Sequence, residues 1–198
     1  MYKNNYPHKR YRITLEFLKK YIDTNEEILD LGVPNPFSEI MKKNNYTVFN
    51  TQGEDLDTEF STVKKSNAST VTAFEIFEHL VAPLNVLREI KADKLIASIP
   101  LKLWFSSAYK NPNDKWDRHY HEFEDWQFDW LLEKSGWEVI SKKKWTNPIK
   151  KIGFRPILRL FFPRYYIVYA VRKPKEMSWS EKRANSEETY SKEFEKLQ

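Results

Sequence analysis

The sequence predicts an α/β fold built on a doubly wound, mostly parallel β-sheet. The clearest indication lies in residues 69–100, where two short β-branched runs, 70–74 and 95–99, flank apolar residues at helical spacing. A strand, a helix and a strand in that order form a unit whose two strands are parallel. Because ligands bind beyond the carboxyl ends of such strands, a functional site is expected after Phe74 and after Ile99.

Length and composition bound the class of protein. With 198 residues, of which 40% are hydrophobic, the chain can bury one core, and we expect one domain over residues 1–174 and a charged tail over 175–198. No apolar run reaches the roughly 18 residues of a transmembrane helix, and the polar N-terminus lacks a signal-peptide centre, so we expect a cytoplasmic protein. The lack of cysteine excludes thiolate chemistry, and the four histidines lack zinc-site spacing, so no metal is expected.

The net charge of +5 is unevenly distributed along the chain. Between residues 139 and 175 there is no acidic residue, and eleven residues are basic: Lys142, Lys143, Lys144, Lys150, Lys151, Arg155, Arg159, Arg164, Arg172, Lys173 and Lys175. Such a stretch predicts a positive face that attracts lipid headgroups, a phosphorylated substrate or nucleic acid, with an ordinary solvated surface as the alternative. Nucleic acid is the least favoured partner, because no RNA-binding signature accompanies the charge.

The strands and helices around the central unit fit the same sheet. Residues 12–22 carry a wide apolar helical face, and the expected strands cover 27–31, 46–51, 137–141 and 165–171. Fewer than twenty residues separate the second strand from Thr70, so the third strand of a nucleotide-binding sheet is expected to be abbreviated or missing.

The turn after the first strand has the outline of an anion- or nucleotide-binding corner. A strand ends at Gly32, and a helix begins within a few residues, so that unpaired helix N–H groups would face a ligand. A nucleotide fingerprint would contain several glycines here. This turn instead contains Pro34 and Pro36, which make the backbone rigid and remove two N–H donors.

Residues 101–121 are expected to form a lid or an inserted binding loop. Twenty residues with little periodicity inside a domain are more often functional than connecting. The aromatic rings of Trp104 and Phe105 are candidates to stack on a flat acceptor, although such clusters also occur in cores. A helix over residues 124–135 follows, with Gly136 as its C-cap.

Taken together, these stretches resemble the class I S-adenosylmethionine-dependent methyltransferases, which have a Rossmann-like fold. The resemblance implies that the last strand is antiparallel, because residues 165–171 fit the family's terminal antiparallel hairpin. The similarity covers residues 27–141 and is most specific at residues 74–80, FEIFEHL, which resemble the E-x-x-E-H signature of the subgroup that includes quinone-biosynthetic enzymes. The segment HEF at residues 121–123 and the later SGW are similar to the family's H-x-F and G-F segment. The resemblance implies S-adenosylmethionine as the cofactor and methyl transfer to a small or lipid-linked acceptor.

The resemblance also implies which residues bind the methionine end of the cofactor. Asp30 and Gly32 match the first-strand motif whose backbone holds it, and Phe74 and Glu75 match the strand end that lines it. His79 matches a histidine that mainly orients this loop and caps its helix.

For the ribose and the adenine the correspondence is looser. Gln52 or its neighbours occupy the place of the ribose-binding acid, and Asp55 or Asp57 the place of an acid that contacts the adenine amino group. Because the family's glycines are replaced after Gly32, a catalytically degenerate methyltransferase fold that binds a ligand or a partner stays as the alternative function.

Methyl transfer from a sulfonium requires alignment of the acceptor and, for some acceptors, removal of a proton. His121 and His119 are the candidate bases, because an imidazole titrates near neutrality; a structural hydrogen bond to the lid is the alternative for His121. Arg155, in the basic stretch, is the candidate partner for an anionic acceptor, and the same stretch predicts peripheral contact with an anionic membrane surface.

Overall fold

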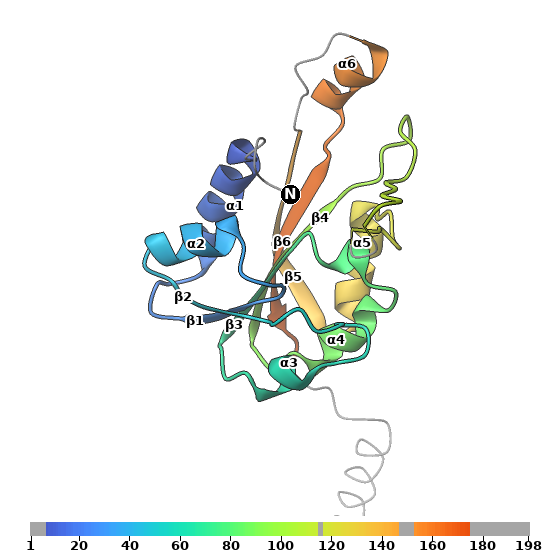
Figure 1. Cartoon of the computed structure of the whole chain (residues 1–198). Coiled ribbons are helices and arrows are strands. Elements are labelled where there is room, and N and C mark those ends of the chain that lie inside the picture. The colour runs from blue at the N-terminus through green and yellow to red at the C-terminus, as the bar shows by residue number, and fades with distance from the viewer. Residues whose placement is uncertain (1–6, 115–116, 147–152, 175–198) are drawn as a thin grey trace, which may run out of the picture.

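The computed structural model describes residues 7–114, 117–146 and 153–174, with the backbone alone at residues 154–156. In these ranges the chain forms one six-stranded sheet flanked by helices (Figure 1). The elements in chain order are α1 (His8–Tyr21), β1 (Glu27–Asp30), α2 (Pro36–Lys43), β2 (Thr47–Asn50), α3 (Ser61–Lys65), β3 (Thr70–Phe74), the 3-10 turn η1 (Phe77–His79), α4 (Pro83–Glu89), β4 (Lys94–Pro100), α5 (Asp125–Lys134), β5 (Trp137–Trp145), α6 (Phe154–Phe161) and β6 (Tyr165–Arg172).

The sheet has the strand order β2-β1-β3-β4-β6-β5. The first four of these strands are parallel, whereas β6 pairs antiparallel with both β4 and β5. The predicted mostly parallel sheet with an antiparallel C-terminal strand is therefore confirmed. β2 lies at the edge of the sheet. The chain that leads from β2 to β3 contains only the five-residue helix α3 and no strand, so the prediction of an abbreviated or missing third strand is also confirmed.

Helices cover both faces of the sheet, which makes two apolar layers. On one face α1 and α2 contribute Leu18, Phe37 and Met41, all of which are buried. On the other face α4 and α5 contribute Leu87 and Phe128. Because both faces are covered, the central strands β3 and β4 are buried almost throughout, as their continuous apolar runs predict.

The structure has more regular elements than expected between residues 142 and 164, the segment that separates the expected strands 137–141 and 165–171. β5 continues to Trp145, and residues 154–161 form α6. Pro100 at the end of β4 pairs with Tyr165 at the start of β6, so α6 lies just beyond the carboxyl ends of the parallel strands. In Figure 1, α6 lies at the end of the molecule opposite to α3.

None of the helices in the described ranges has the length and apolarity needed to cross a membrane. The expected tail over 175–198 lies outside the described residues.

Candidate functional site

A cavity of about 650 Å³ opens at the carboxyl ends of the parallel strands. Its walls come from the ends of β1 and β3, the N-terminal regions of α1 and α2, and the segment 109–119 of the expected lid. The cavity therefore lies where strand direction predicts a ligand site.

The turn after β1 forms one wall and is held by polar contacts. The Asp30 side chain is buried and accepts hydrogen bonds from the Thr72 hydroxyl at 2.7 Å and the Asn50 amide at 3.1 Å. The Gly32 amide donates to the Thr51 hydroxyl at 2.6 Å, and Asn50 also donates to the Gly32 carbonyl at 3.1 Å. Burial, only partly offset by these hydrogen bonds, raises the pKa of Asp30 to about 7.

Gly32 has a backbone conformation that favours glycine, with φ at +109°. A Cβ atom at this position would lie 3.2 Å from Cδ1 of Ile76, which also lines the cavity. The backbone of this turn therefore requires a glycine at position 32, where the turn has its single glycine.

The N-terminus of α2 is capped from within the chain, which differs from the expected anion-binding corner. The Asn35 side chain accepts hydrogen bonds from the amides of Phe37 and Ser38, and the Ser38 hydroxyl accepts one from the Asn35 amide. Pro36 occupies the first helical position, where the missing N–H has no helical partner to lose. The two prolines thus fit the helix start, but the first amides of α2 already have partners.

Two carboxyl groups stand at the end of β3. Glu75 has a φ of +58° and is fixed by Arg10, at 3.2 Å, and by the Ser98 hydroxyl, at 3.0 Å. Glu78 is buried, and its Oε2 atom has no hydrogen-bond partner among the described residues. Burial raises the pKa of both groups; Arg10 opposes the rise at Glu75, whereas the nearby Glu75 carboxylate adds to it at Glu78.

Histidines from η1 and from the lid face these carboxyl groups. The rings of His79 and His119 pack edge to face at 4.8 Å, and His79 Nδ1 lies 3.0 Å from the Arg118 carbonyl. Nδ1 of His119 is buried without a hydrogen-bond partner in the described structure. Burial is the main cause that lowers the pKa of His119, and the charge of the nearby His79 lowers it further. Glu78, His79 and His119 bring ligand atoms within 4.8 Å of one another, which is a donor set that could also hold a cation.

Tyr109 and Asp117 complete the lid side of the cavity. The Tyr109 hydroxyl donates to Asp117 at 2.6 Å, and the Asn111 amide donates to the same carboxylate at 2.8 Å. The Tyr109 ring lies 4.5 Å from that of His119, so the lid has a defined internal structure here.

Most of the predicted cofactor residues come together in the cavity. Its lining includes Asp30, Gly32, Phe74, Glu75 and His79, together with the candidate base His119.

Other predicted residues lie outside that lining. Nε2 of His121 is 3.2 Å from the Val81 carbonyl, and its ring stacks on Phe123. Gln52 lines a separate hollow beside β2, and the backbone carbonyl of Asp55 accepts hydrogen bonds in the turn that follows. Asp57, the alternative to Asp55, instead accepts from the amides of Val81 and Ala82 before α4.

The predicted acceptor residues lie toward α6. The rings of Trp104 and Phe105 contact each other at 5.4 Å and contact Phe162, just after α6, at 6.0 and 5.7 Å. Arg155 belongs to α6, but its side chain is outside the described residues.

Sequence reasoning missed Arg10, Asn35, Tyr109 and Asp117. Arg10 comes from α1, which the apolar pattern identified only as a packing helix, and Tyr109 and Asp117 are polar groups within a segment without periodicity. Asn35 could have been identified from the sequence, because Asn with Pro directly after it and Ser three residues later is typical of a helix N-cap.

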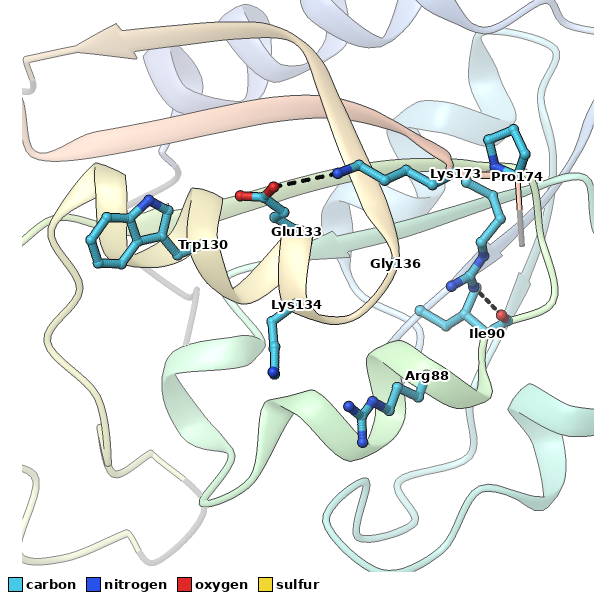
Figure 2. Close-up of a pocket in the computed structure, with 9 residues that line it drawn as sticks. Arg88, Ile90, Trp130, Glu133, Lys134, Gly136, Lys173 and Pro174 are labelled. Atoms are coloured by element: carbon cyan, nitrogen blue, oxygen red, sulfur yellow. Dashed lines mark hydrogen bonds and ion pairs between the residues drawn. The ribbon is translucent and has the colours of Figure 1, made fainter. Parts of the chain in front are cut away.

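A second hollow, of about 870 Å³, lies near the amino end of β4 between α4, α5 and the end of β6 (Figure 2). Arg172 donates to the Ile90 carbonyl there, and Lys173 pairs with Glu133 at 3.5 Å. These two cations hold the ends of α4, β6 and α5 together. The predicted site residues do not line this hollow, so the cavity at the carboxyl ends is the candidate site.

Comparison with known proteins identifies the fold. No protein-family model and no curated protein sequence matches the chain. Among solved structures it is similar to 1,6-didemethyltoxoflavin-N1-methyltransferase from Burkholderia thailandensis with bound 1,6-didemethyltoxoflavin and S-adenosylhomocysteine, with 13% identity over 83% of this chain and 78% of the other and a TM-score of 0.58. A methyltransferase from Methanosarcina mazei matches with 10% identity over 80% and 98% and a TM-score of 0.59. The fold is that of the class I S-adenosylmethionine-dependent methyltransferases.

The same fold also supports other chemistry. The 4+2 cyclase SpnF matches with 12% identity over 88% of this chain and 84% of the other, with a TM-score of 0.54. At these identities the likeness shows the methyltransferase fold alone, and the reaction has to be argued from the residues of the cavity.

Proposed function

We propose that this protein is an S-adenosylmethionine-dependent methyltransferase that acts on a small or lipid-linked acceptor. The observation that carries the proposal is the cavity at the carboxyl ends of β1 and β3, which joins the Gly32 turn, Glu75 and the lid in a methyltransferase fold. Its volume of about 650 Å³ is in the range of small-molecule sites.

The cavity residues fit the charges of S-adenosylmethionine. The methionine end carries an ammonium and a carboxylate, and the cavity offers the carboxylate of Glu75 and the guanidinium of Arg10, which lie 3.2 Å apart. Gly32 lines the cavity without a side chain, so a ligand can approach the main chain at this turn. We assign the methionine end to Asp30, Gly32, Phe74, Glu75 and His79 in the cavity, and we assign the ribose and adenine to the region of Gln52 and Asp55, which lies outside the cavity lining.

The chain's own residues align the acceptor and provide a base that can take its proton. Bound S-adenosylmethionine supplies a methyl group already activated on a sulfonium. An acceptor that bears a hydroxyl or an amine must lose a proton, and His119 can receive it, because its lowered pKa keeps the imidazole neutral near pH 7. Of the two histidines considered as bases, we assign the role to His119, because His121 is not among the residues that line the cavity. The lid, through Tyr109 and Asp117, would exclude water.

The acceptor that suits this site is flat or amphipathic and carries a negative charge. Trp104 and Phe105 offer aromatic surface beside the lid, and Arg155 in α6 offers a positive charge. An isoprenoid-like chain on the acceptor would be compatible with the aromatic surface.

Methyl transfer is tested with methyl-labelled S-adenosylmethionine and a panel of aromatic hydroxyl and amine acceptors, each with and without an isoprenoid chain. We expect transfer by the full chain. A His119→Gln variant should lower kcat about a hundredfold and leave S-adenosylhomocysteine binding unchanged, whereas His121→Gln serves as the matched control with a small effect.

Two results would contradict this account. Equal rates for wild type and His119→Gln would remove His119 as the base. Cofactor binding by the wild type without transfer to any acceptor would favour the alternative of a ligand-binding module on a methyltransferase fold.

A further inference from the structure

Apolar side chains gather at the end of the molecule that carries α6. Ile157, Leu160 and Phe161 follow a spacing of three and four residues, which places them on one face of the helix. Phe162, immediately after the helix, contacts Trp104 from the start of the lid. These five side chains, which we call the α6 tip, are 38–73% exposed, so the fold leaves their apolar surface in water.

The surroundings of the α6 tip are basic. Four of its five residues lie in α6 or directly after it, and residues 153–164 contain the basic residues Arg155, Arg159 and Arg164 and no acidic residue. Arg159, on α6 itself, has a buried Nε atom without a hydrogen-bond partner among the described residues. An apolar helical face beside positive charge is the pattern of a helix that lies in the interface of an anionic membrane.

A second copy of this chain is a poorer occupant of the same face. Pairing two α6 tips would bring Arg155, Arg159 and Arg164 of one copy toward those of the other, and like charges repel. A surface of acidic lipid supplies both the negative charge and the apolar interior that the tip needs.

The α6 tip and the cavity lie at the same edge of the sheet. Tyr165, which follows α6 and begins β6, pairs with Pro100 at the carboxyl end of β4. The Arg10 guanidinium, which lines the cavity, lies 5.5 Å above the Tyr165 ring. The start of the lid is tied to the same place, because the Leu101 amide donates to the Arg164 carbonyl at 2.7 Å.

From these observations we propose that the α6 tip docks the protein on the surface of an anionic lipid bilayer, with Leu160, Phe161 and Trp104 inserted among the lipids. Docking in this way turns the carboxyl edge of the sheet, and with it the cavity, toward the membrane. The supply of an acceptor from the bilayer rests on the proposed function, whereas the docking itself does not.

The test is flotation of the full chain with vesicles of phosphatidylcholine alone or mixed with phosphatidylglycerol, without cofactor or acceptor. We expect binding to the anionic vesicles that weakens as salt shortens the Debye length from about 10 Å at 0.1 M to about 3 Å at 1 M. A Leu160→Ser/Phe161→Ser variant should bind at least about tenfold more weakly, since each side chain loses the transfer of its apolar surface.

The matched control replaces exposed aromatic residues elsewhere, in a Trp126→Ser/Trp130→Ser variant of α5. It should bind vesicles like the wild type. Equal binding to neutral vesicles, unchanged binding by the Leu160→Ser/Phe161→Ser variant, or loss of a dimer in that variant instead of loss of vesicle binding would each overturn the proposal. Vesicle binding without methyl transfer would leave docking standing and count only against the proposed function.

Discussion

Asp30 belongs both to the buried end of a strand and to the lining of the cavity. It ends β1, is 2% exposed, and its two oxygens accept hydrogen bonds from neighbouring strands. Because no cation among the described residues offsets its burial, its pKa rises from 3.8 to about 7. At Glu75 in the same cavity, burial also raises the pKa, but Arg10 at 3.2 Å opposes the rise.

The pKa of Asp30 predicts a pH-dependent stability. The folded state keeps the proton up to about pH 7, whereas the unfolded state releases it near 3.8, so this group destabilises the fold increasingly as pH rises between those values. An Asp30→Asn variant has no carboxyl group at this position and does not lose this stability as pH rises. Its free energy of unfolding should therefore rise relative to wild type from pH 4 to 7, by on the order of 3 kcal/mol.

Urea denaturation of both proteins at several pH values measures this difference. The comparison cancels the titration of groups that both proteins share. A difference that stays constant from pH 4 to 7 would show that Asp30 is ionised throughout this range.

At the scale of the element, the start of α2 is the clearest local structure near the site. Asn35 and Ser38 form a reciprocal capping box, with Pro36 at the first helical position. The amides that a glycine-rich turn would offer to a ligand are thus already paired inside the chain.

The cap predicts a stability effect that depends on side-chain chemistry. Asn35→Ala should lower the free energy of unfolding by about 1 kcal/mol, because the amides of Phe37 and Ser38 lose their acceptor. Asn35→Ser keeps an acceptor oxygen and should retain most of the stability. Equal losses in the two variants, measured by urea denaturation, would contradict the capping role.

Elements with a buried face were predictable from the sequence, whereas α6 was not. The central strands β3 and β4 follow β-branched apolar runs because they pack on both sides, and β6 does so as well. α6 has only eight residues, and although its apolar side chains follow helical spacing, it exposes much of that apolar face instead of packing it on the core. The same exposure is what suggests a membrane partner.

At the scale of the whole molecule, strand direction explains why part of the site was predictable. Asp30 and Phe74 end neighbouring parallel strands, and Gly32 and Glu75 follow them, so the rule for strand ends brings all four together. Arg10, Tyr109 and Asp117 reach the cavity from α1 and the lid, whose positions depend on packing that the local sequence does not encode. His121 was expected beside His119 in the site, but it faces the Val81 carbonyl instead.

The central claim is that the cavity beyond β1 and β3 binds S-adenosylmethionine. Calorimetric titration of the full chain with S-adenosylhomocysteine tests it most directly, with a Gly32→Val variant, checked by circular dichroism, as the comparison. We predict saturable binding at one site per chain in the wild type and its loss in the variant, where a branched side chain would crowd Ile76 and strain a φ of +109°. No heat from the wild type at millimolar ligand, or equal affinity in the two proteins, would contradict the claim.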